Sequence, residues 1–429
     1  MKTLSNPTRL PGELNQTTRA EVELLLCCAR TQIEPERVER IQALLALELD
    51  WESLITLATR HRVLPLLFHN LQQVAPRTLP LKELTHLQIF FSHHTFRNLN
   101  QTAEIIRLVD LLAQNNIQAI PFKGPALTLN VYGDIALRQF DDLDILVPQS
   151  DFFEARALLM TQGGYQRPKP SNFLTLEQEL SHLRSGYACS LVNLDRKTFV
   201  DLHQQLTGGT FLPYPFDFQE LHQRLVPVSQ TPQLLTLHPE DLLLYLCVHG
   251  AKSLWERLGW ICDVAELVRA YPTIDWEQLL KKAQTAKIER MLLLGLHLAN
   301  QVLGMPLPAE IRAQINADLE AKRLAKQVSQ RLLSGEGGLN ANFHLDKLKF
   351  QFRAIADPRE QVRYCIKCFY RHGLTPIWRV FRPTEKEWQF IKLPRSFHFL
   401  YYLIRPMRLL GREAANVWKN FSSQSSEQM

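Results

Sequence analysis

The feature of this chain that most constrains its fold is a short apolar strand, a Lys-Gly-Pro turn and, after a helical segment, a second strand that opens on alternating carboxylates. Residues 117–122 are mostly apolar and predict the first strand, and Lys123, Gly124 and Pro125 follow it directly. Proline suits the first turn of a helix, and glycine allows the backbone to approach a ligand closely. The amides at such a helix start attract a phosphate group, and Lys123 adds a mobile cation. Lys123 and Gly124 are therefore predicted to bind phosphate, although the turn does not have the P-loop pattern.

The second strand, residues 142–147, reads Asp-Leu-Asp-Ile-Leu-Val. Side chains alternate between the two faces of a strand, so Asp142 and Asp144 share one face while Leu143 and Ile145 point into a core. Two carboxylates on one face can share a divalent cation, and Mg²⁺ prefers carboxylate oxygens together with phosphate oxygens and water. The pair therefore indicates a metal-bound triphosphate. Aspartates at a strand start also cap turns or pair with basic residues, which is the alternative interpretation.

A third carboxylate, which a pair of metal ions requires, is predicted in residues 198–203, Thr-Phe-Val-Asp-Leu-His. Alternation places Asp201 and His203 on one face of this strand. Residues 187–192 predict a partner strand, and residues 193–196 predict the turn between the two. Asp201 is the candidate third metal ligand, although a carboxylate on an open sheet can also simply face solvent. His203 either contacts phosphate or acceptor, or is a partly buried histidine bonded to a backbone carbonyl.

Three further basic side chains are candidates for nucleotide contacts. Arg138 lies just ahead of the carboxylates and either neutralises triphosphate charge or forms an ion pair with Asp141 or Asp142. His249 and Lys252 are three residues apart in a helical pattern, so they share a face that can reach a nucleotide. Packing between helices explains His249 equally well. Arg138 and Lys252 are therefore predicted as nucleotide-binding residues.

The aromatic residues support a structural interpretation more than a functional one. Trp255, Trp260 and Phe122 can stack on a base, but aromatic side chains at helical spacing more often belong to a core, so they are not predicted as site residues. The stretch 397–410 is aromatic and flanked by arginines, which is compatible with an anionic membrane surface. Packing of this stretch against the helical region is favoured, because apolar stripes usually face a core.

The patterns along the chain predict an α+β fold with a small mixed or antiparallel sheet and flanking helices. Apolar positions recur at helical spacing in a lead-in over residues 1–115, and short strands with one helix at 151–161 fill residues 116–235. Helical patterns return over residues 236–429. We therefore expect three units: a helical lead-in, a catalytic core with the sheet and a C-terminal helical domain. The lead-in helices are predicted at 24–29, 41–49, 54–66 and 105–112.

Composition limits the class of protein and its compartment. A hydrophobic fraction of 45% in 429 residues is ample for a packed core, and no apolar run approaches the roughly 20 residues that a transmembrane helix needs. The 7 cysteines form no regular disulfide framework and the N-terminus does not resemble a secretory signal, which predicts a cytoplasmic protein. The net charge of +6 is compatible with an anionic substrate. An RNA-modifying transferase is a third functional hypothesis on that ground alone, since no RNA-binding module is recognisable.

The succession of strand, Lys-Gly turn, helix, Arg138, Asp-x-Asp strand and Val-Asp-Leu-His strand resembles the uncharacterised nucleotidyltransferase family of the polymerase-beta-like superfamily. The usual turn of the superfamily is Gly-Ser, and the Lys-Gly of this chain is typical of the family. The resemblance extends over nearly the whole chain. It includes Trp51, His61, Pro65 and Leu66, then His249 to Lys252, Trp255, Trp260 to Asp263, Leu393-Pro394 and Tyr401 to Arg408.

The resemblance implies two-metal transfer of a nucleoside monophosphate from a nucleoside triphosphate, with ATP as the expected nucleotide. Asp142 and Asp144 would bind two Mg²⁺ ions, with Mn²⁺ as a substitute, and Asp201 would bind one of them and help to activate the acceptor. The acceptor, which can be a protein, RNA or a small molecule, does not follow from the resemblance, nor does the oligomeric state. The alternative is a non-catalytic protein on the same fold that senses a nucleotide and binds a partner.

Overall fold

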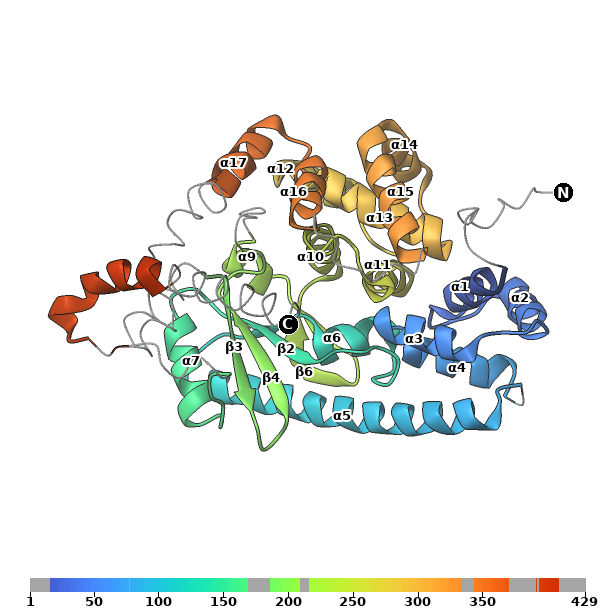
Figure 1. The fold of residues 1–429 in the computed structure, drawn as a ribbon, viewed down its shortest axis with the longest axis horizontal. Helices are drawn as coiled ribbons and strands as arrows, with labels where there is room; N and C mark the ends of the chain where they lie inside the picture. The colour runs from blue at the N-terminus through green and yellow to red at the C-terminus, as the bar shows by residue number, and fades with distance from the viewer. Residues whose placement is uncertain are drawn as a thin grey trace, which may run out of the picture.

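The computed structural model describes residues 16–76, 78–168, 186–208, 216–333, 343–369, 391 and 393–408 of the 429-residue chain. In this part, five helices precede the first strand, and the fifth runs along one side of the sheet (Figure 1). The described residues before β1 therefore form helices and the turns that connect them. Its helices are α1 (Gln16–Cys28), α2 (Pro35–Leu45), α3 (Trp51–Arg60), α4 (Leu64–Val74) and α5 (Leu81–Gln114).

The helix predicted over 54–66 is in fact two helices, with a break between Arg60 and Leu64. Arg62 in this break has a φ of 60°, which interrupts the helix. The start of α11 (Leu258–Ala270) docks on the break. The backbone N–H of Gly259 donates to the carbonyl oxygen of His61 at 3.0 Å. The C-terminal helices are thus fixed against the N-terminal ones at this point.

Helix α5 extends beyond the predicted residues 105–112. Much of its remaining buried face is polar, so an apolar pattern does not reveal that part of the helix. Asn98 donates from Nδ2 to the carbonyl oxygen of Arg138 at 3.1 Å. Gln101 donates from Nε2 to the carbonyl oxygen of Asp141 at 3.2 Å. These bonds satisfy backbone groups of the loop that precedes the carboxylate strand. Helix α5 therefore holds that loop in place.

The sheet is mixed, as predicted, with the strand order β1-β2-β4-β3. Strands β2 and β4 are parallel, and β1 and β3 pair antiparallel with β2 and β4, respectively. The first strand is shorter than the predicted 117–122. The predicted hairpin is confirmed, with its turn at 194–197 instead of the predicted 193–196. The strands are β1 (Ile120–Pro121), β2 (Asp142–Leu146), β3 (Ala188–Asn193) and β4 (Thr198–His203).

The two faces of the sheet have different environments, as alternation predicts. Leu143, Ile145, Val200 and Leu202 are buried in a cluster with apolar side chains of α5 and of α7 (Phe152–Thr161). The opposite face carries the carboxylates and faces the C-terminal helices. Between β1 and β2 the chain forms α6 (Gly124–Leu127) and the π-helical η1 (Thr128–Tyr132).

The C-terminal helices share one hydrophobic cluster with the N-terminal helices. Leu24 and Leu54 belong to the same buried cluster as Leu243, Met291 and Phe350. The three-unit division at 115 and 235 stays a prediction. The elements of this region are α9 (Phe218–His222), β5 (Val226–Val228), β6 (Thr231–Thr236), α10 (Pro239–Lys252), α11, α12 (Trp276–Thr285), α13 (Glu289–Leu303), α14 (Ala309–Ala317), α15 (Leu319–Leu333), α16 (Phe343–Ala354), α17 (Pro358–Cys368) and the 3₁₀-helical η4 (Arg395–Leu400).

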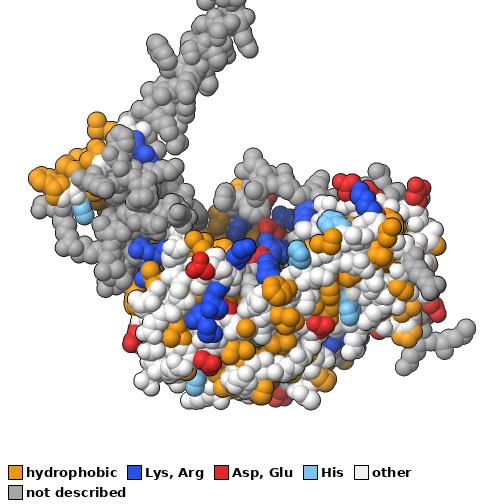
Figure 2. Space-filling model, turned by 90° about the horizontal axis from the view of Figure 1, so that it is seen from below, with side chains coloured by type: hydrophobic (Ala, Val, Ile, Leu, Met, Phe, Trp, Pro, Cys, Tyr) orange, Lys and Arg blue, Asp and Glu red, His pale blue; other side chains and the backbone are white. Residues whose placement is uncertain are grey.

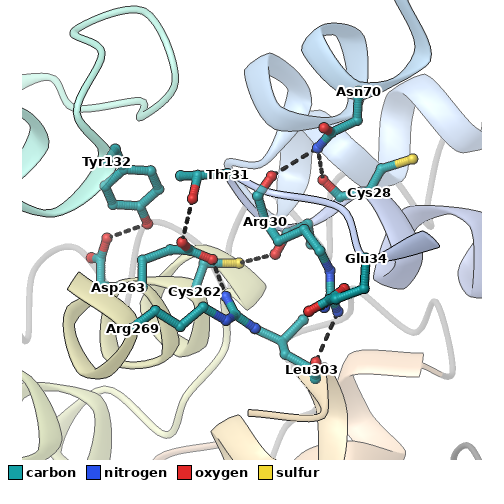
Figure 3. A network of polar contacts seen from close by, with 12 residues as sticks. Cys28, Arg30, Thr31, Glu34, Asn70, Tyr132, Cys262, Asp263, Arg269 and Leu303 are labelled. Carbon is teal, nitrogen blue, oxygen red and sulfur yellow. Dashed lines mark hydrogen bonds and ion pairs between the residues drawn. The ribbon is translucent and has the colours of Figure 1, made fainter. Parts of the chain in front are cut away.

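Polar contacts reinforce the junction between the two helical regions (Figure 3). Arg30, which is fully buried, donates from Nη2 to the carbonyl oxygen of Leu303 at 2.8 Å. Thr31 donates from Oγ1 to Glu266 of α11 at 2.6 Å. On the same helix, Asp263 accepts a hydrogen bond from Tyr132. Helix α11 therefore connects the N-terminal helices to the segment beside the sheet.

The stretch 397–410, whose described part ends at residue 408, exposes most of its large apolar side chains, and its packing against the helical region stays a prediction. Tyr401 is buried and donates from its hydroxyl to the carbonyl oxygen of Ile391 at 2.7 Å. Large apolar side chains around it are exposed and form the apolar patch at the left of Figure 2: Phe397, Phe399, Tyr402, Leu403 and Met407. Among the described helices, none combines the length and the apolar character that a membrane crossing requires.

Candidate active site

The Lys-Gly turn packs directly against the first residue of β2. Gly124 has a φ of 52°, and a Cβ atom at this position would lie 3.2 Å from the carbonyl oxygen of Asp142. A left-handed backbone so close to another segment favours glycine. Pro125 lies in the first turn of α6, as predicted. The turn therefore holds Lys123, whose side chain is 16% exposed, beside the Asp-x-Asp strand.

Asp144 lies at the centre of the predicted site. Its side chain is 3% exposed, and its Oδ1 accepts a hydrogen bond from Nε2 of His203 at 3.1 Å and lies 3.6 Å from Nζ of Lys123. Asp201 is opposite Asp144 in the parallel pair of β2 and β4. Ligand atoms of Asp144, Asp201 and His203 lie within 4.8 Å of one another. Asp142 is on the same face but is not a member of this group.

The charges of these groups are strongly coupled. Burial, and then the neighbouring carboxylate of Asp144, raise the pKa of Asp142 above its ordinary value. Burial also opposes ionisation of Asp144, but Lys123 and the hydrogen bond from His203 outweigh it and hold the pKa of Asp144 well below the usual range. Burial likewise disfavours the Lys123 ammonium, yet the attraction of Asp144 raises the pKa of Lys123. Asp144 and Lys123 are therefore an ion pair at neutral pH, and Asp142 adds further negative charge.

The donor set fits a divalent cation. Oδ2 of Asp144 and Nδ1 of His203 are buried and have no hydrogen-bond partner among the described residues. Buried polar atoms normally have a partner, so each such orphan requires an explanation. Carboxylate oxygens are the ligands that Mg²⁺ and Mn²⁺ prefer, and a cation beside Asp144 would also offset the repulsion from Asp142 and Asp201.

A cavity of about 210 Å³ opens beside β2, between the Lys-Gly turn and the helices α10 and α11. Its wall includes Lys123, Gly124, Arg138, Asp142 and Asp144 of the predicted site. Asp201, His203 and Lys252, in contrast, are not among the described residues that line it. The structure therefore brings five of the predicted residues to one cavity, and Asp201 and His203 lie close to Asp144 without lining that cavity.

One interpretation of the sequence pairs Arg138 with Asp141 or Asp142. In the structure, Arg138 pairs with Asp263 instead. Its Nε and Nη2 donate to the two carboxylate oxygens of Asp263 at 2.7 and 3.0 Å. Tyr132 donates from its hydroxyl to Oδ1 of the same carboxylate at 2.7 Å. The remaining nitrogen, Nη1, is buried without a partner among the described residues. Arg138 and Asp263 both line the cavity, so a fixed guanidinium with one unused donor lies in its wall.

The other candidates lie as follows. Asp141 pairs with Arg62 and Arg97. Lys252 lies outside the cavity wall, where its Nζ donates to the hydroxyl of Tyr187 at 3.3 Å and is 4.3 Å from the centre of that ring. His249 lines the cavity.

Asp263 and Tyr132 were not predicted as site residues. Asp263 is the single acidic residue in the apolar run Ile-Cys-Asp-Val-Ala at 261–265, and it is 2% exposed. A lone carboxylate inside an apolar helical pattern signals a buried ion pair, because an isolated buried charge is unfavourable. That signal indicates a partner but does not identify it.

A search of curated proteins finds no match to this sequence. The model of a family described as uncharacterised nucleotidyltransferase matches residues 48–304, which include every predicted site residue. Residues 393–394 and 401–408, which also carried the resemblance, lie outside the match. The family model therefore covers less of the chain than the resemblance implied. Because the match spans more than half of the sequence, the chain belongs to this nucleotidyltransferase family and hence to the transferases.

Proposed function

We propose that this protein is a magnesium-dependent nucleotidyltransferase that transfers a nucleoside monophosphate from a nucleoside triphosphate, with ATP as the expected donor, to a protein, RNA or small-molecule acceptor. The observation that carries the proposal is the position of Asp144. It faces Asp201 across two parallel strands and also lines a cavity whose wall holds Lys123 and Arg138. Carboxylates and phosphate-binding cations are thus adjacent in a member of a nucleotidyltransferase family.

Asp142, Asp144 and Asp201 would hold two Mg²⁺ ions, for which Mn²⁺ is a substitute. When bound, such ions supply positive charge to the attacking and leaving oxygens of a phosphoryl group. His203 fixes the orientation of Asp144 through its hydrogen bond to Oδ1, which leaves Oδ2 free for coordination. His203 therefore acts in this proposal as a positioning residue.

Lys123 and Arg138, which both line the cavity, hold the triphosphate. Arg138 contributes its unused Nη1 donor, and Asp263 keeps the guanidinium from turning away. Lys123 contributes a cation that Asp144 balances when no nucleotide is present. Gly124 lets the backbone pass close to β2 and to the bound phosphates. The nucleotide contact predicted for Lys252 is not part of the proposal, because its amine lies against Tyr187.

The test is incubation of the protein with each of the four labelled nucleoside triphosphates and Mg²⁺ in a lysate of the host. We expect pyrophosphate release and transfer of label to an acceptor, both abolished by EDTA and restored by Mg²⁺ or Mn²⁺. Nucleotide binding without pyrophosphate release would instead support the nucleotide-sensing alternative. RNA as the labelled species, with salt-dependent binding, would support the RNA-modifying hypothesis.

Asp142→Asn is expected to stabilise the protein in the absence of metal and to abolish the stabilisation by Mg²⁺. The pKa of Asp142 is raised in the folded state by burial and by Asp144, so the folded state binds a proton more readily than the unfolded chain. Its contribution to stability therefore falls as pH rises through the raised pKa, and it is unfavourable at neutral pH. We expect the variant to melt about 1–3 °C higher than wild type at pH 7.5 in EDTA, with a smaller difference at about pH 4, near the ordinary carboxyl pKa.

Thermal unfolding at both pH values, with EDTA or with Mg²⁺, measures this effect. Asp195→Asn, in the exposed turn between β3 and β4, is the matched control and should leave the Mg²⁺ response unchanged. A lower melting temperature of Asp142→Asn at pH 7.5 in EDTA, or an undiminished Mg²⁺ response, would contradict the assignment of Asp142 to the metal site.

A further inference from the structure

The three aromatic residues that are candidates for base stacking differ in their exposure. Trp255 and Phe122 are completely buried and belong to the core. Trp260, in the first turn of α11, is only partly buried and lines the cavity beside the carboxylates. Of the three, Trp260 alone is therefore accessible to a ligand in this cavity.

Trp260 lies between a cation and a second ring. The guanidinium carbon of Arg257 is 5.4 Å from the centre of the Trp260 ring system. The imidazole of His249 meets the indole edge-on, with ring centres 5.2 Å apart and an interplanar angle of 87°. All three side chains line the cavity. Planar groups from the end of α10 and the start of α11 are thus gathered at one part of its wall.

A continuous series of contacts connects this group to the phosphate-binding end of the cavity. His249 stacks on Tyr245 one helical turn earlier, with ring centres 5.9 Å apart. The Tyr245 ring is 5.1 Å from Nζ of Lys123, which in turn lies beside Asp144. The cavity therefore has carboxylates and an ammonium at one end, and an indole, an imidazole and a guanidinium next to them.

The side chains of Trp260, His249 and Arg257 are better suited to bind a flat, polar ring than to bind a phosphate group. Indole and guanidinium planes stack on nucleobases, and every base offers a π face for such stacking. Burial, and then the charge of Lys123, hold the pKa of His249 well below its usual range. A neutral imidazole has no charge to attract phosphate, and it offers one N–H donor and one acceptor nitrogen, which can bond the edge of a base.

We propose that His249, Arg257 and Trp260 form a subsite for the nucleobase of the donor, with the base stacked on the Trp260–Arg257 pair. The proposal rests on the proposed function, since a base reaches this wall only if its triphosphate lies at the Asp142–Asp144 end. It assigns the donor to the nucleoside triphosphates as a class and excludes simple polyphosphates as equivalent substrates.

The experiment compares two probes by titration calorimetry with the full-length protein and Mg²⁺. One is the tightest binder among ATP, GTP, CTP and UTP, and the other is inorganic tripolyphosphate, which has no base. Trp260→Ala should weaken binding of the nucleotide by roughly 5- to 150-fold, the range expected for loss of one stacked base, and leave tripolyphosphate affinity unchanged. Trp260→Phe should retain most of the nucleotide affinity, because the ring is preserved.

Two further variants make the result interpretable. Trp276→Ala removes a partly buried tryptophan at the start of α12, outside the cavity wall, and should affect neither probe. Arg257→Gln removes the cation at the indole and should weaken the nucleotide selectively, which provides the test if Trp260→Ala fails to fold.

The outcomes distinguish the subsite from the function on which it rests. If Trp260→Ala weakens both probes equally, or weakens neither, the base subsite is refuted while the triphosphate site stands. If the wild-type protein binds neither probe, the proposed function fails, and the subsite fails with it.

Discussion

Asp144→Asn is expected to lower the rate of nucleotidyl transfer by about 10³-fold or more, the effect of removing a central preorganised charge from an active site. Asp144 is 3% exposed, and its ligand atoms lie close to Lys123, His203 and Asp201, so it is the central carboxylate of the site. The amide oxygen of asparagine can still accept the hydrogen bond from His203, which preserves the local geometry. Pyrophosphate release and label transfer measure the rate.

Metal affinity provides an independent measurement of the same substitution. Calorimetric titration with Mn²⁺ should show a large loss of affinity in Asp144→Asn, whereas the surface control Asp195→Asn should bind as the wild type does. Thermal unfolding establishes that the variant is folded. Activity within tenfold of the wild type in a folded Asp144→Asn variant would refute the assignment of this residue.

Asp263→Ala is expected to destabilise the protein by about 3–5 kcal/mol, because it leaves the guanidinium of Arg138 buried without its partner. The side chain of Arg138 is 12% exposed and that of Asp263 is 2% exposed. The substitution also removes the acceptor of the Tyr132 hydroxyl, which is itself buried. Urea denaturation measures the change, with the slope of the transition compared to detect any loss of two-state behaviour.

A paired substitution separates stability from function. Arg138→Met combined with Asp263→Leu replaces the buried ion pair by apolar side chains and should recover most of the lost stability. The same double variant should still bind tripolyphosphate more weakly than the wild type, because it lacks the Nη1 donor. Wild-type affinity in the double variant would show that Arg138 does not contact phosphate.

Short-range patterns in the sequence predicted the parts of the site that lie on single elements. Alternation placed Asp142 and Asp144 on one face of a strand, and the hairpin with Asp201 and His203 followed from the turn at 193–196. The Gly124 turn was likewise recognisable, because its left-handed backbone is a local property. Each of these inferences depends on residues that are close to one another along the chain.

Helix α5 was only partly predictable, because its buried face is polar over much of its length. Asn98 and Gln101 are buried, as an apolar residue would be, but they bind the backbone of the loop before β2. A hydrophobic pattern cannot reveal a buried face of this kind. The expected helix over 105–112 corresponds to the part of α5 whose buried side chains, Ile105, Leu108 and Leu112, are apolar.

The sequence by itself thus determined which residues carry the candidate chemistry: the alternating carboxylates, the lysine and glycine of the turn, and the strand with Asp201. Only the tertiary structure decided that Arg138 pairs with Asp263, a partner 125 residues away, and that Trp260 lines the cavity while Trp255 is buried. Periodicity assigns a residue to a face of its own element. Which other element covers that face depends on how helices from both ends of the chain pack together, and that packing is a long-range property of the whole fold.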